Sequence, residues 1–266
     1  MPEPRKKIGL TLGGGSARGW SHVGVLRALE ERGVRPDVVC GTSAGALVGA
    51  AYVLGQLDDF ERWLGSLEKR DVLSYFDFSL TGGMLKGERI FDLFSLHVED
   101  RPIESLPLPF GAVATDLESG AEVWLRRGSL RDAVRASISV PALFKPVRIE
   151  GRWCIDGSLS NPVPVSLCRA LGAEVVIAVD VNGGLLSRQR AFSQESEPSL
   201  LEVTERSLHI AQARLTQPRL AADPPDLLIA PEAGDIGFLE FHRAKESFAA
   251  GRESVDAVSG ELARFL

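Results

Sequence analysis

The chain has 266 residues, 44% hydrophobic and 25% charged, and its 36 acidic and 30 basic side chains give a formal net charge of −6. This composition is typical of a globular protein, and the acidic balance argues against a general nucleic-acid binder. No run reaches the ~18 apolar residues that span a bilayer, and no signal-peptide core follows the amino terminus. Three scattered cysteines favour neither a disulfide framework nor a zinc site, so we expect a cytoplasmic protein.

The predicted elements alternate between strands and helices. A first strand, Lys7–Leu12, runs through a glycine cluster into a helix over Trp20–Arg32. A second strand, Asp37–Cys40, leads through Gly41–Gly45 into a helix of small residues, Ala46–Leu54. Further strands are predicted at Phe110–Thr115, Glu122–Arg126, Pro146–Ile149, Val175–Asp180 and Asp226–Ala230. Strands interleaved with helices predict an α/β fold whose mostly parallel sheet is covered on both faces.

Four further segments are assigned from their local composition. Asp116–Gly120 is typical of a hairpin turn. Gly237–Leu266 has a helical apolar pattern, with Gly251 as a candidate break. Val72–Leu85 and Asn182–Pro198 fit no regular element, and the second of these, which is polar, is predicted to be a mobile loop.

The segment Gly41-Thr42-Ser43-Ala44-Gly45 is the only Gly-x-Ser-x-Gly sequence in the chain. A strand is predicted before it and a helix after it, the context in which a nucleophilic serine stands on a strained turn. The serine hydroxyl would then lie near a helix amino terminus, whose partial positive charge favours a developing anion. The alternative is a structural turn in which the serine only caps the helix.

A second glycine-rich segment, Gly13-Gly14-Gly15-Ser16-Ala17-Arg18-Gly19, also lies between a strand and a helix. Backbone without side chains lets N–H groups converge on an oxyanion or a phosphate. A dinucleotide-binding pattern would need glycine at position 18, and a phosphate-binding Walker loop would need lysine at position 20. The chain has Arg18 and Trp20 there, so a nucleotide-binding protein is disfavoured. Arg18 either fixes the loop or attracts an anionic head group.

A serine nucleophile needs a base, and the histidines fit this role poorly. His97, His209 and His242 lie in predicted helical segments, where a surface or capping role is expected, and the same is expected of His22, although it is near the glycine loop. A carboxylate can replace histidine if its pKa is raised towards the working pH. Our first choice is Asp156, in the only Asp-Gly pair of the chain.

Two other carboxylates compete with Asp156 for the role of base. Asp116 is the weaker choice because it belongs to the predicted hairpin, and Asp180, at a strand end, is expected to hold loops together. The Asp156-Gly157 pair on its own is more typical of a turn.

Taken in order, the glycine-rich segment, Gly-x-Ser-x-Gly and Asp-Gly resemble the motifs of the patatin-like phospholipase family. Four longer stretches are also similar to it: Ser21–Leu29, Ala114–Gly120, Ala136–Pro141 and Asp156–Pro164. The resemblance runs from about Ile8 to Asp180, whereas Val181–Leu266 matches only generally.

This resemblance implies a three-layer α/β/α acyl hydrolase. It implies a single domain over 1–266, with the motifs in a core of about 8–180 and a helical part of about 199–266. Ser43 would be the nucleophile and Asp156 the base, without a catalytic histidine, a metal or a cofactor, and His22 would be a structural residue. The other site residues implied are Gly13, Gly14, Gly15, Ser16 and Arg18 for the oxyanion hole, Gly41, Thr42, Ala44 and Gly45 for the nucleophile elbow, and Gly157 and Ser158 for the Asp-Gly motif. Ser158 departs from the family, which more often has glycine or alanine there.

The expected function is hydrolysis of lipid acyl esters by a phospholipase A, a lysophospholipase or a carboxylesterase. The alternative is a catalytically silent lipid-binding or regulatory protein on the same scaffold. The aromatic residues of Val72–Leu85 would contact a lipid interface, form a lid or line an acyl pocket. A net charge of −6 does not favour anionic membranes, so a soluble ester and a peripheral contact with the inner face of the membrane both stay open. The sequence leaves the head group, the position of cleavage and the oligomeric state undetermined.

Overall fold

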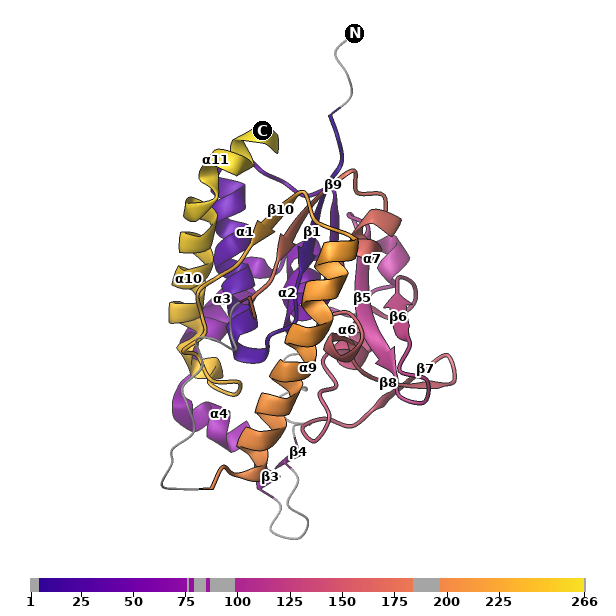
Figure 1. Ribbon diagram of the computed structural model, residues 1–266, viewed down its shortest axis with the longest axis vertical. Helices are drawn as coiled ribbons and strands as arrows, with labels where there is room; N and C mark the ends of the chain where they lie inside the picture. Colours follow the sequence, from indigo (N-terminus) through magenta and orange to yellow (C-terminus); the bar gives the residue numbers. More distant parts are fainter. Residues whose placement is uncertain (1–4, 76, 79–84, 87–98, 184–196, 266) are drawn as a thin grey trace.

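The computed structural model describes residues 5–75, 77–78, 85–86, 99–183 and 197–265 (Figure 1). Its centre is an eight-stranded sheet in the order β10-β9-β1-β2-β5-β8-β7, with β6 paired to β5. The strands of this sheet are β1 (Ile8–Leu12), β2 (Val38–Thr42), β5 (Phe110–Asp116), β6 (Glu122–Leu125), β7 (Val147–Ile149), β8 (Arg152–Asp156), β9 (Val175–Val179) and β10 (Leu227–Ile229). A separate two-stranded pair joins β3 (Asp77–Phe78) to β4 (Leu85–Lys86).

Five neighbouring strands, from β10 to β5, run parallel to one another. Parallel strands covered on both faces favour continuous apolar runs, and β9 has the sequence Val-Val-Ile-Ala-Val with every residue buried. The predicted α/β fold with a mostly parallel sheet is therefore confirmed.

Helices cover both faces of the sheet. The helices are α1 (Ser21–Glu31), α2 (Ala44–Val53), α3 (Leu57–Ser66), α4 (Lys69–Tyr75), α6 (Leu130–Ser137), α7 (Val165–Ala170), α9 (Leu200–Ala222), α10 (Ala244–Ala257) and α11 (Ser259–Leu262). Short 3-10 turns are η1 (Ser16–Trp20), η2 (Ile103–Ser105), η3 (Gly157–Leu159), η4 (Phe241–Arg243) and η5 (Ala263–Phe265). Figure 1 shows α1 and α10 side by side on one face, with α7 and the end of α9 on the other.

The pairing of β5 determines the position of the site. Its first half pairs with β2, up to Thr42 opposite Val113, and its last residues pair with β8, beginning with Asp156 opposite Ala114. Since β8 is antiparallel to β5, the ends of β2 and β8 meet at the same point of the sheet. The residue after β2 is Ser43, so the serine and Asp156 come together there.

Most predicted elements are found close to their predicted bounds, and the Asp116–Gly120 hairpin is confirmed because the Gly120 N–H donates to the Asp116 carbonyl at 2.8 Å. Strand β8 was not predicted, because the Asp-Gly pair at its end was interpreted as a turn. The predicted helix over 237–266 is wrong at its start, since α10 begins at Ala244.

The candidate break at Gly251 is also wrong, because α10 continues through this residue. A Cβ at position 251 would lie 2.0 Å from the Ser21 carbonyl oxygen, so the missing side chain allows α1 and α10 to approach closely.

Within the described ranges, no helix has the length and apolarity needed to cross a bilayer. The three cysteines are free and buried. The prediction that 72–85 fits no regular element is wrong in part, since α4 continues to Tyr75 and the segment contains β3 and the first residue of β4. The predictions for its aromatic side chains and for residues 184–196 fall largely outside the described residues, as does His97.

Candidate active site

Ser43 stands on a sharp turn between β2 and α2. Its φ of 55° and ψ of −124° lie in a region that residues with side chains rarely adopt. A Cβ at position 45 would lie 2.1 Å from the Leu12 carbonyl oxygen, so only glycine lets α2 approach β1 this closely. The strained turn makes the serine point out of the sheet, as the Gly-x-Ser-x-Gly context predicted.

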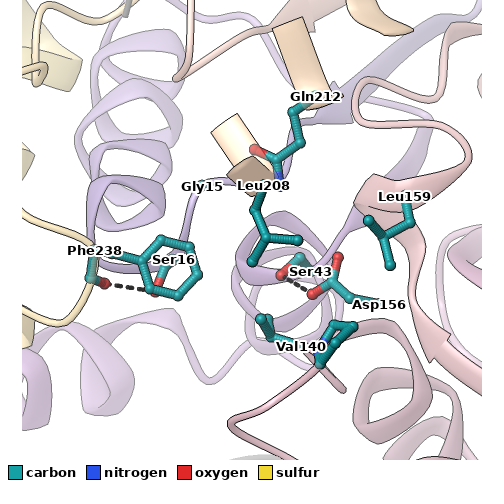
Figure 2. A pocket seen from close by; sticks show the side chains of 10 residues that line it. Gly15, Ser16, Ser43, Val140, Asp156, Leu159, Leu208, Gln212 and Phe238 are labelled. Atoms are coloured by element: carbon teal, nitrogen blue, oxygen red, sulfur yellow. Dashed lines mark hydrogen bonds between the residues drawn. The ribbon is translucent and has the colours of Figure 1, made fainter. Parts of the chain in front are cut away.

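The Ser43 hydroxyl donates a hydrogen bond of 2.6 Å to Oδ2 of Asp156 (Figure 2). The other carboxylate oxygen, Oδ1, accepts the N–H of Ser158 at 2.8 Å. Both side chains are nearly enclosed, with 5% of Ser43 and 3% of Asp156 exposed. The structure thus brings together the two residues that the sequence predicted as nucleophile and base.

Neighbouring backbone and hydroxyl groups hold this pair in place. The Asp156 N–H donates to the Ser139 carbonyl at 3.0 Å, and the Thr115 hydroxyl donates to the Asp156 carbonyl at 2.8 Å. On the other side, the Ser43 N–H donates to the Ser137 hydroxyl at 2.8 Å.

Burial raises the pKa of Asp156 to about 6, because the charged carboxylate loses its hydration. The Ser43 hydroxyl and the N–H and hydroxyl of Ser158 oppose this effect by stabilising the carboxylate. A carboxylate with a pKa near 6 is largely ionised at pH 7 and still basic enough to accept a proton from a hydroxyl.

The glycine loop has both satisfied and open N–H groups. The N–H of Gly13 donates to the Val179 carbonyl at 2.9 Å, that of Gly14 to the Pro162 carbonyl at 3.0 Å and that of Arg18 to the Gly15 carbonyl at 3.2 Å. By contrast, the N–H groups of Gly15 and Ser16 make no hydrogen bond to another described residue. Both residues line the pocket beside Ser43.

Arg18 lies inside the protein, 1% exposed, and binds three parts of the chain. Its guanidinium donates to the Asn182 side-chain oxygen at 3.2 Å, to the Ile236 carbonyl at 3.0 Å and to Nε2 of His209 at 2.6 Å. Of the two roles that the sequence left open, this geometry favours fixing the loop.

The surface or capping role expected of the histidines is wrong for two of them, since His22 and His209 are buried. Nε2 of His22 lies 2.7 Å from the Gly13 carbonyl, which agrees with the structural role at the start of the helix that the family resemblance implied. Sequence reasoning missed His209 because its partner, Arg18, lies 191 residues away.

The two competing carboxylates lie elsewhere. Asp116 accepts the N–H groups of Glu118 and Ser119 within the hairpin, and these bonds lower its pKa. Asp180 is buried and accepts the Asn182 N–H at 3.0 Å, so it holds a loop as expected.

A pocket of about 270 Å³, including its open mouth, lies over the serine and the carboxylate. It is lined by Gly15, Ser16, Ser43, Val140, Pro141, Asp156, Leu159, Leu208, Gln212 and Phe238. Only Gly15, Ser16, Ser43 and Asp156 were predicted as site residues. Val140, Pro141 and Leu159 lie in stretches that resemble the family but were given no role, and Leu208, Gln212 and Phe238 come from the part of the chain that resembles it only generally. Leu208 and Gln212 are four residues apart on α9, and this helical spacing was the only signal in the sequence.

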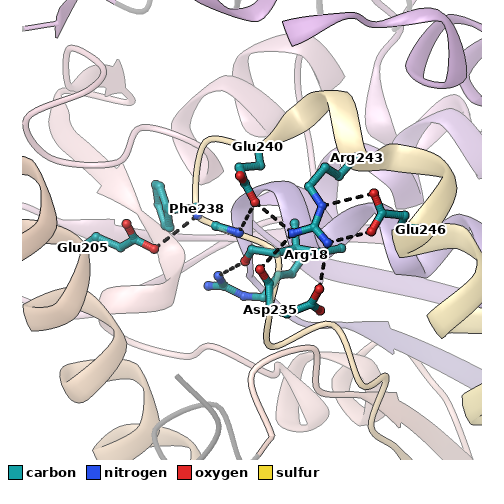
Figure 3. A network of polar contacts seen from close by, with 9 residues as sticks. Arg18, Glu205, Asp235, Phe238, Glu240, Arg243 and Glu246 are labelled. Carbon is teal, nitrogen blue, oxygen red and sulfur yellow. Dashed lines mark hydrogen bonds and ion pairs between the residues drawn. The ribbon is translucent and has the colours of Figure 1, made fainter. Parts of the chain in front are cut away.

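Phe238 joins the pocket wall to the glycine loop. Its carbonyl accepts the Ser16 hydroxyl at 2.6 Å and the Ala17 N–H at 3.3 Å, and its N–H donates to Glu205 of α9 at 3.2 Å. Arg243 braces the same segment by binding Asp235, Glu240 and Glu246 (Figure 3). The carboxy-terminal segment therefore shapes the pocket without contributing a motif.

Comparison with known proteins identifies the family. The family model described as patatin-like phospholipase matches residues 10–169. An uncharacterized NTE family protein of Mycobacterium tuberculosis is 33% identical over 92% of this chain and 89% of its own length. A lysophospholipase of Aspergillus fumigatus is 30% identical over 92% of this chain, which matches 18% of that longer protein.

Among solved structures, VipD from Legionella pneumophila superposes with a TM-score of 0.55 at 15% identity, over 96% of this chain and 67% of that one. This likeness supports the fold. The family match and the relatives show that the chain belongs to the patatin-like phospholipase family and is a hydrolase of carboxylic esters.

Proposed function

We propose that this protein hydrolyses lipid acyl esters with Ser43 as the nucleophile and Asp156 as the general base. The observation that carries the proposal is the buried 2.6 Å hydrogen bond from the serine hydroxyl to the carboxylate. A nucleophile and a base within hydrogen-bond reach are the basic requirement of acyl transfer through a serine.

The reaction then proceeds in two halves. Asp156 accepts the hydroxyl proton while Ser43 Oγ attacks the ester carbonyl, and the tetrahedral intermediate expels the alcohol, which takes up that proton. In the second half, Asp156 removes a proton from water, which attacks the acyl-serine and releases the fatty acid. The proton then returns from Asp156 to the serine oxygen.

The N–H groups of Gly15 and Ser16 are our choice for the donors to the oxyanion, since each lines the pocket without a partner among the described residues. Gly13, Gly14 and Arg18 support the hole by giving the loop its shape. Losing one donor would remove about 3 kcal/mol of transition-state stabilisation.

The substrate proposed is an ester with an apolar acyl chain. Val140, Leu159, Leu208 and Phe238 give the pocket an apolar wall beside the serine. The lysophospholipase relative supports a lipid substrate.

Fluorophosphonate labelling followed by intact mass and peptide mapping tests the nucleophile. We expect one adduct, on Ser43, that is absent in Ser43→Ala and present in Ser254→Ala, a control that removes a buried hydroxyl from α10. Turnover of a soluble fatty-acyl ester should fall about a thousandfold or more in Ser43→Ala and Asp156→Asn.

The matched control for the base is Asp180→Asn, which neutralises another buried carboxylate at a strand end. We expect this variant to stay within a few-fold of the wild type. Full turnover in folded Ser43→Ala or Asp156→Asn would overturn the assignment. No labelling, even with lipid micelles, would do the same and would favour a silent lipid-binding protein.

A further inference from the structure

Three large apolar side chains are exposed on one face of the sheet near the site. They are Leu117, Trp124 and Trp153, with exposed fractions of 49%, 37% and 45%. In the antiparallel pairing, Trp124 lies opposite Val113 and Leu117 lies beside Trp153, whose carbonyl accepts the Leu117 N–H at 2.8 Å. Because side chains alternate along a strand, Trp124 and Trp153 point to the same side of the sheet, and Leu117 follows β5 in the adjoining turn.

Two arginines lie over the tryptophan rings. The guanidinium of Arg126 is 5.5 Å from the centre of the Trp124 ring, and that of Arg148 is 5.9 Å from the centre of the Trp153 ring. We call these four residues and Leu117 the tryptophan–arginine face. It combines amphipathic rings with guanidinium groups, which are more weakly hydrated than ammonium groups.

The charge of this region differs from that of the whole chain. Residues 124–153 contain seven Lys and Arg side chains against two Asp and Glu, in a chain of net charge −6. Five of these arginines have no ion pair with another described residue, namely Arg126, Arg127, Arg131, Arg148 and Arg152. Elsewhere, Arg27, Arg169 and Arg243 each bind at least two carboxylates. Guanidinium groups without a direct ion pair are therefore gathered here, although Arg152 interacts electrostatically with Asp116 and Arg127 with Glu104.

The tryptophan–arginine face and the pocket share strand β8. Trp153 and Asp156 lie on this strand three residues, or ~10 Å, apart, so their side chains point to opposite sides of the sheet. The connection from α6 to β7 contributes Val140 and Pro141 to the pocket wall and leads to Arg148 of the face. A surface held against this face would therefore contact the strand that carries Asp156 without covering Asp156 itself.

We propose that the tryptophan–arginine face binds the surface of a membrane that contains anionic phospholipids. Tryptophan is favoured at the boundary between head groups and acyl chains, and basic residues near an anionic surface gain electrostatic attraction. A net charge of −6 disfavours binding to such membranes, but the guanidinium groups gathered in this region can still be attracted to them. The benefit to catalysis rests on the proposed function, but binding itself does not.

A single-stranded nucleic acid is the competing partner, since bases stack on exposed aromatic rings. Here Arg126 and Arg148 already lie over the rings, and Leu117 adds an apolar side chain that offers nothing to a base. Both features favour a lipid surface.

Vesicle co-sedimentation of the Ser43→Ala protein tests binding without hydrolysis. We expect partitioning onto phosphatidylcholine vesicles containing about one third phosphatidylglycerol to be about tenfold or more stronger than onto phosphatidylcholine alone, and to weaken with salt. Replacing both tryptophans by serine, or Arg126 and Arg148 by glutamate, should each reduce it about tenfold.

The matched control is Arg62→Glu with Arg264→Glu, which makes the same change in charge on α3 and η5 and should alter binding less than about twofold. Equal losses in the control and in the face variants, no preference for anionic vesicles, or tighter binding to an oligonucleotide would each overturn the proposal.

The same substitutions in protein that retains Ser43 distinguish a failure of this proposal from a failure of the proposed function. They should leave turnover of a soluble ester unchanged, which also shows that the variants fold, and should reduce release of fatty acid from anionic vesicles. Vesicle binding without any ester turnover would refute the proposed chemistry but not the membrane face.

Discussion

The carboxyl group of Asp156 is the proposed general base, and burial, opposed by hydrogen bonds, leaves its pKa at about 6. A general base works only in its ionised form, so activity must be lost as the pH falls through this value. We predict that kcat/KM for a soluble ester decreases about tenfold per pH unit below pH 6 and is level above pH 7. A profile measured on stably folded protein from pH 5 to 8 without this limb would contradict the role of Asp156.

Ser158 is the residue that departs from the family pattern, and it touches this carboxyl. Its N–H binds Oδ1, and its buried hydroxyl has no well-aligned partner among the described residues, although it helps lower the pKa of Asp156. The hydroxyl lies against the glycine loop, since a Cβ at position 14 would be 2.1 Å from it.

We predict that Ser158→Ala raises the pKa of Asp156, because the hydroxyl dipole that lowers this pKa is removed while the backbone N–H bond to Oδ1 stays. The acidic limb of kcat/KM should move to higher pH. Ser160→Ala is the control, because the Ser160 hydroxyl is in the same turn but lies 2.8 Å from the hydroxyl of Thr115. An equal shift in both variants would show that Ser158 has no special effect on the base.

At the scale of elements, the position of the segment before α10 is held by the ion pairs of one arginine. Arg243 binds Asp235 at 2.7 Å, Glu240 at 3.0 Å and Glu246 at 2.6 Å, and these carboxylates raise its pKa (Figure 3). Phe238, within this segment, contacts both the pocket and the glycine loop.

We therefore predict that Arg243→Ala reduces kcat/KM several-fold, because Phe238 and the Ser16 hydrogen bond lose their fixed position. Arg252→Ala is a matched control, since Arg252 binds Glu31 from α10 but does not touch the pocket segment. Steady-state measurement of kcat/KM for both variants tests this prediction. Equal activity of the two would mean that Phe238 is held without Arg243.

The elements also show what the sequence could predict. The turn that carries Ser43 was predictable, because a strained serine beside a strand needs glycine at fixed positions. The neighbouring strands were predictable, because buried parallel strands need unbroken apolar runs. Strand β8 was missed because Arg152-Trp153-Cys154 has no alternating pattern and Asp156-Gly157 is typical of a turn. Its strand conformation depends on pairing with β5, which no local pattern records.

At the scale of the whole molecule, the buried polar groups that join distant parts of the chain were also beyond prediction. Arg18 meets His209 and Ile236, and neither position has a motif that would mark it. An arginine in a glycine loop looks like a surface anion contact until α9 folds over it. Burial of both side chains is then a property of the complete fold, and its consequence is a dependence of stability on pH.

As the pH falls, His22 and His209 decrease the stability of the fold, whereas Asp156 increases it. Burial lowers the pKa of His22 to about 4, and burial together with Arg18 lowers the pKa of His209 to about 3. Each histidine therefore takes up a proton on unfolding below its ordinary value of 6.5, so stability is lost as the pH falls. Asp156 has a folded pKa of about 6 against an ordinary 3.8, so it costs stability at pH 7 and regains it towards pH 4.

From pH 7 to pH 5, each histidine should remove about 2 kcal/mol of unfolding free energy and Asp156 should restore about 1.5 kcal/mol. We predict that the wild type loses stability over this interval and that Asp156→Asn loses more. His209→Gln should lose less because glutamine does not titrate, and its amide oxygen can still accept the hydrogen bond from Arg18. Urea unfolding of the three proteins at both pH values measures these differences. Equal losses in all three would mean that neither His209 nor Asp156 is held in the wild-type fold with its pKa shifted by burial.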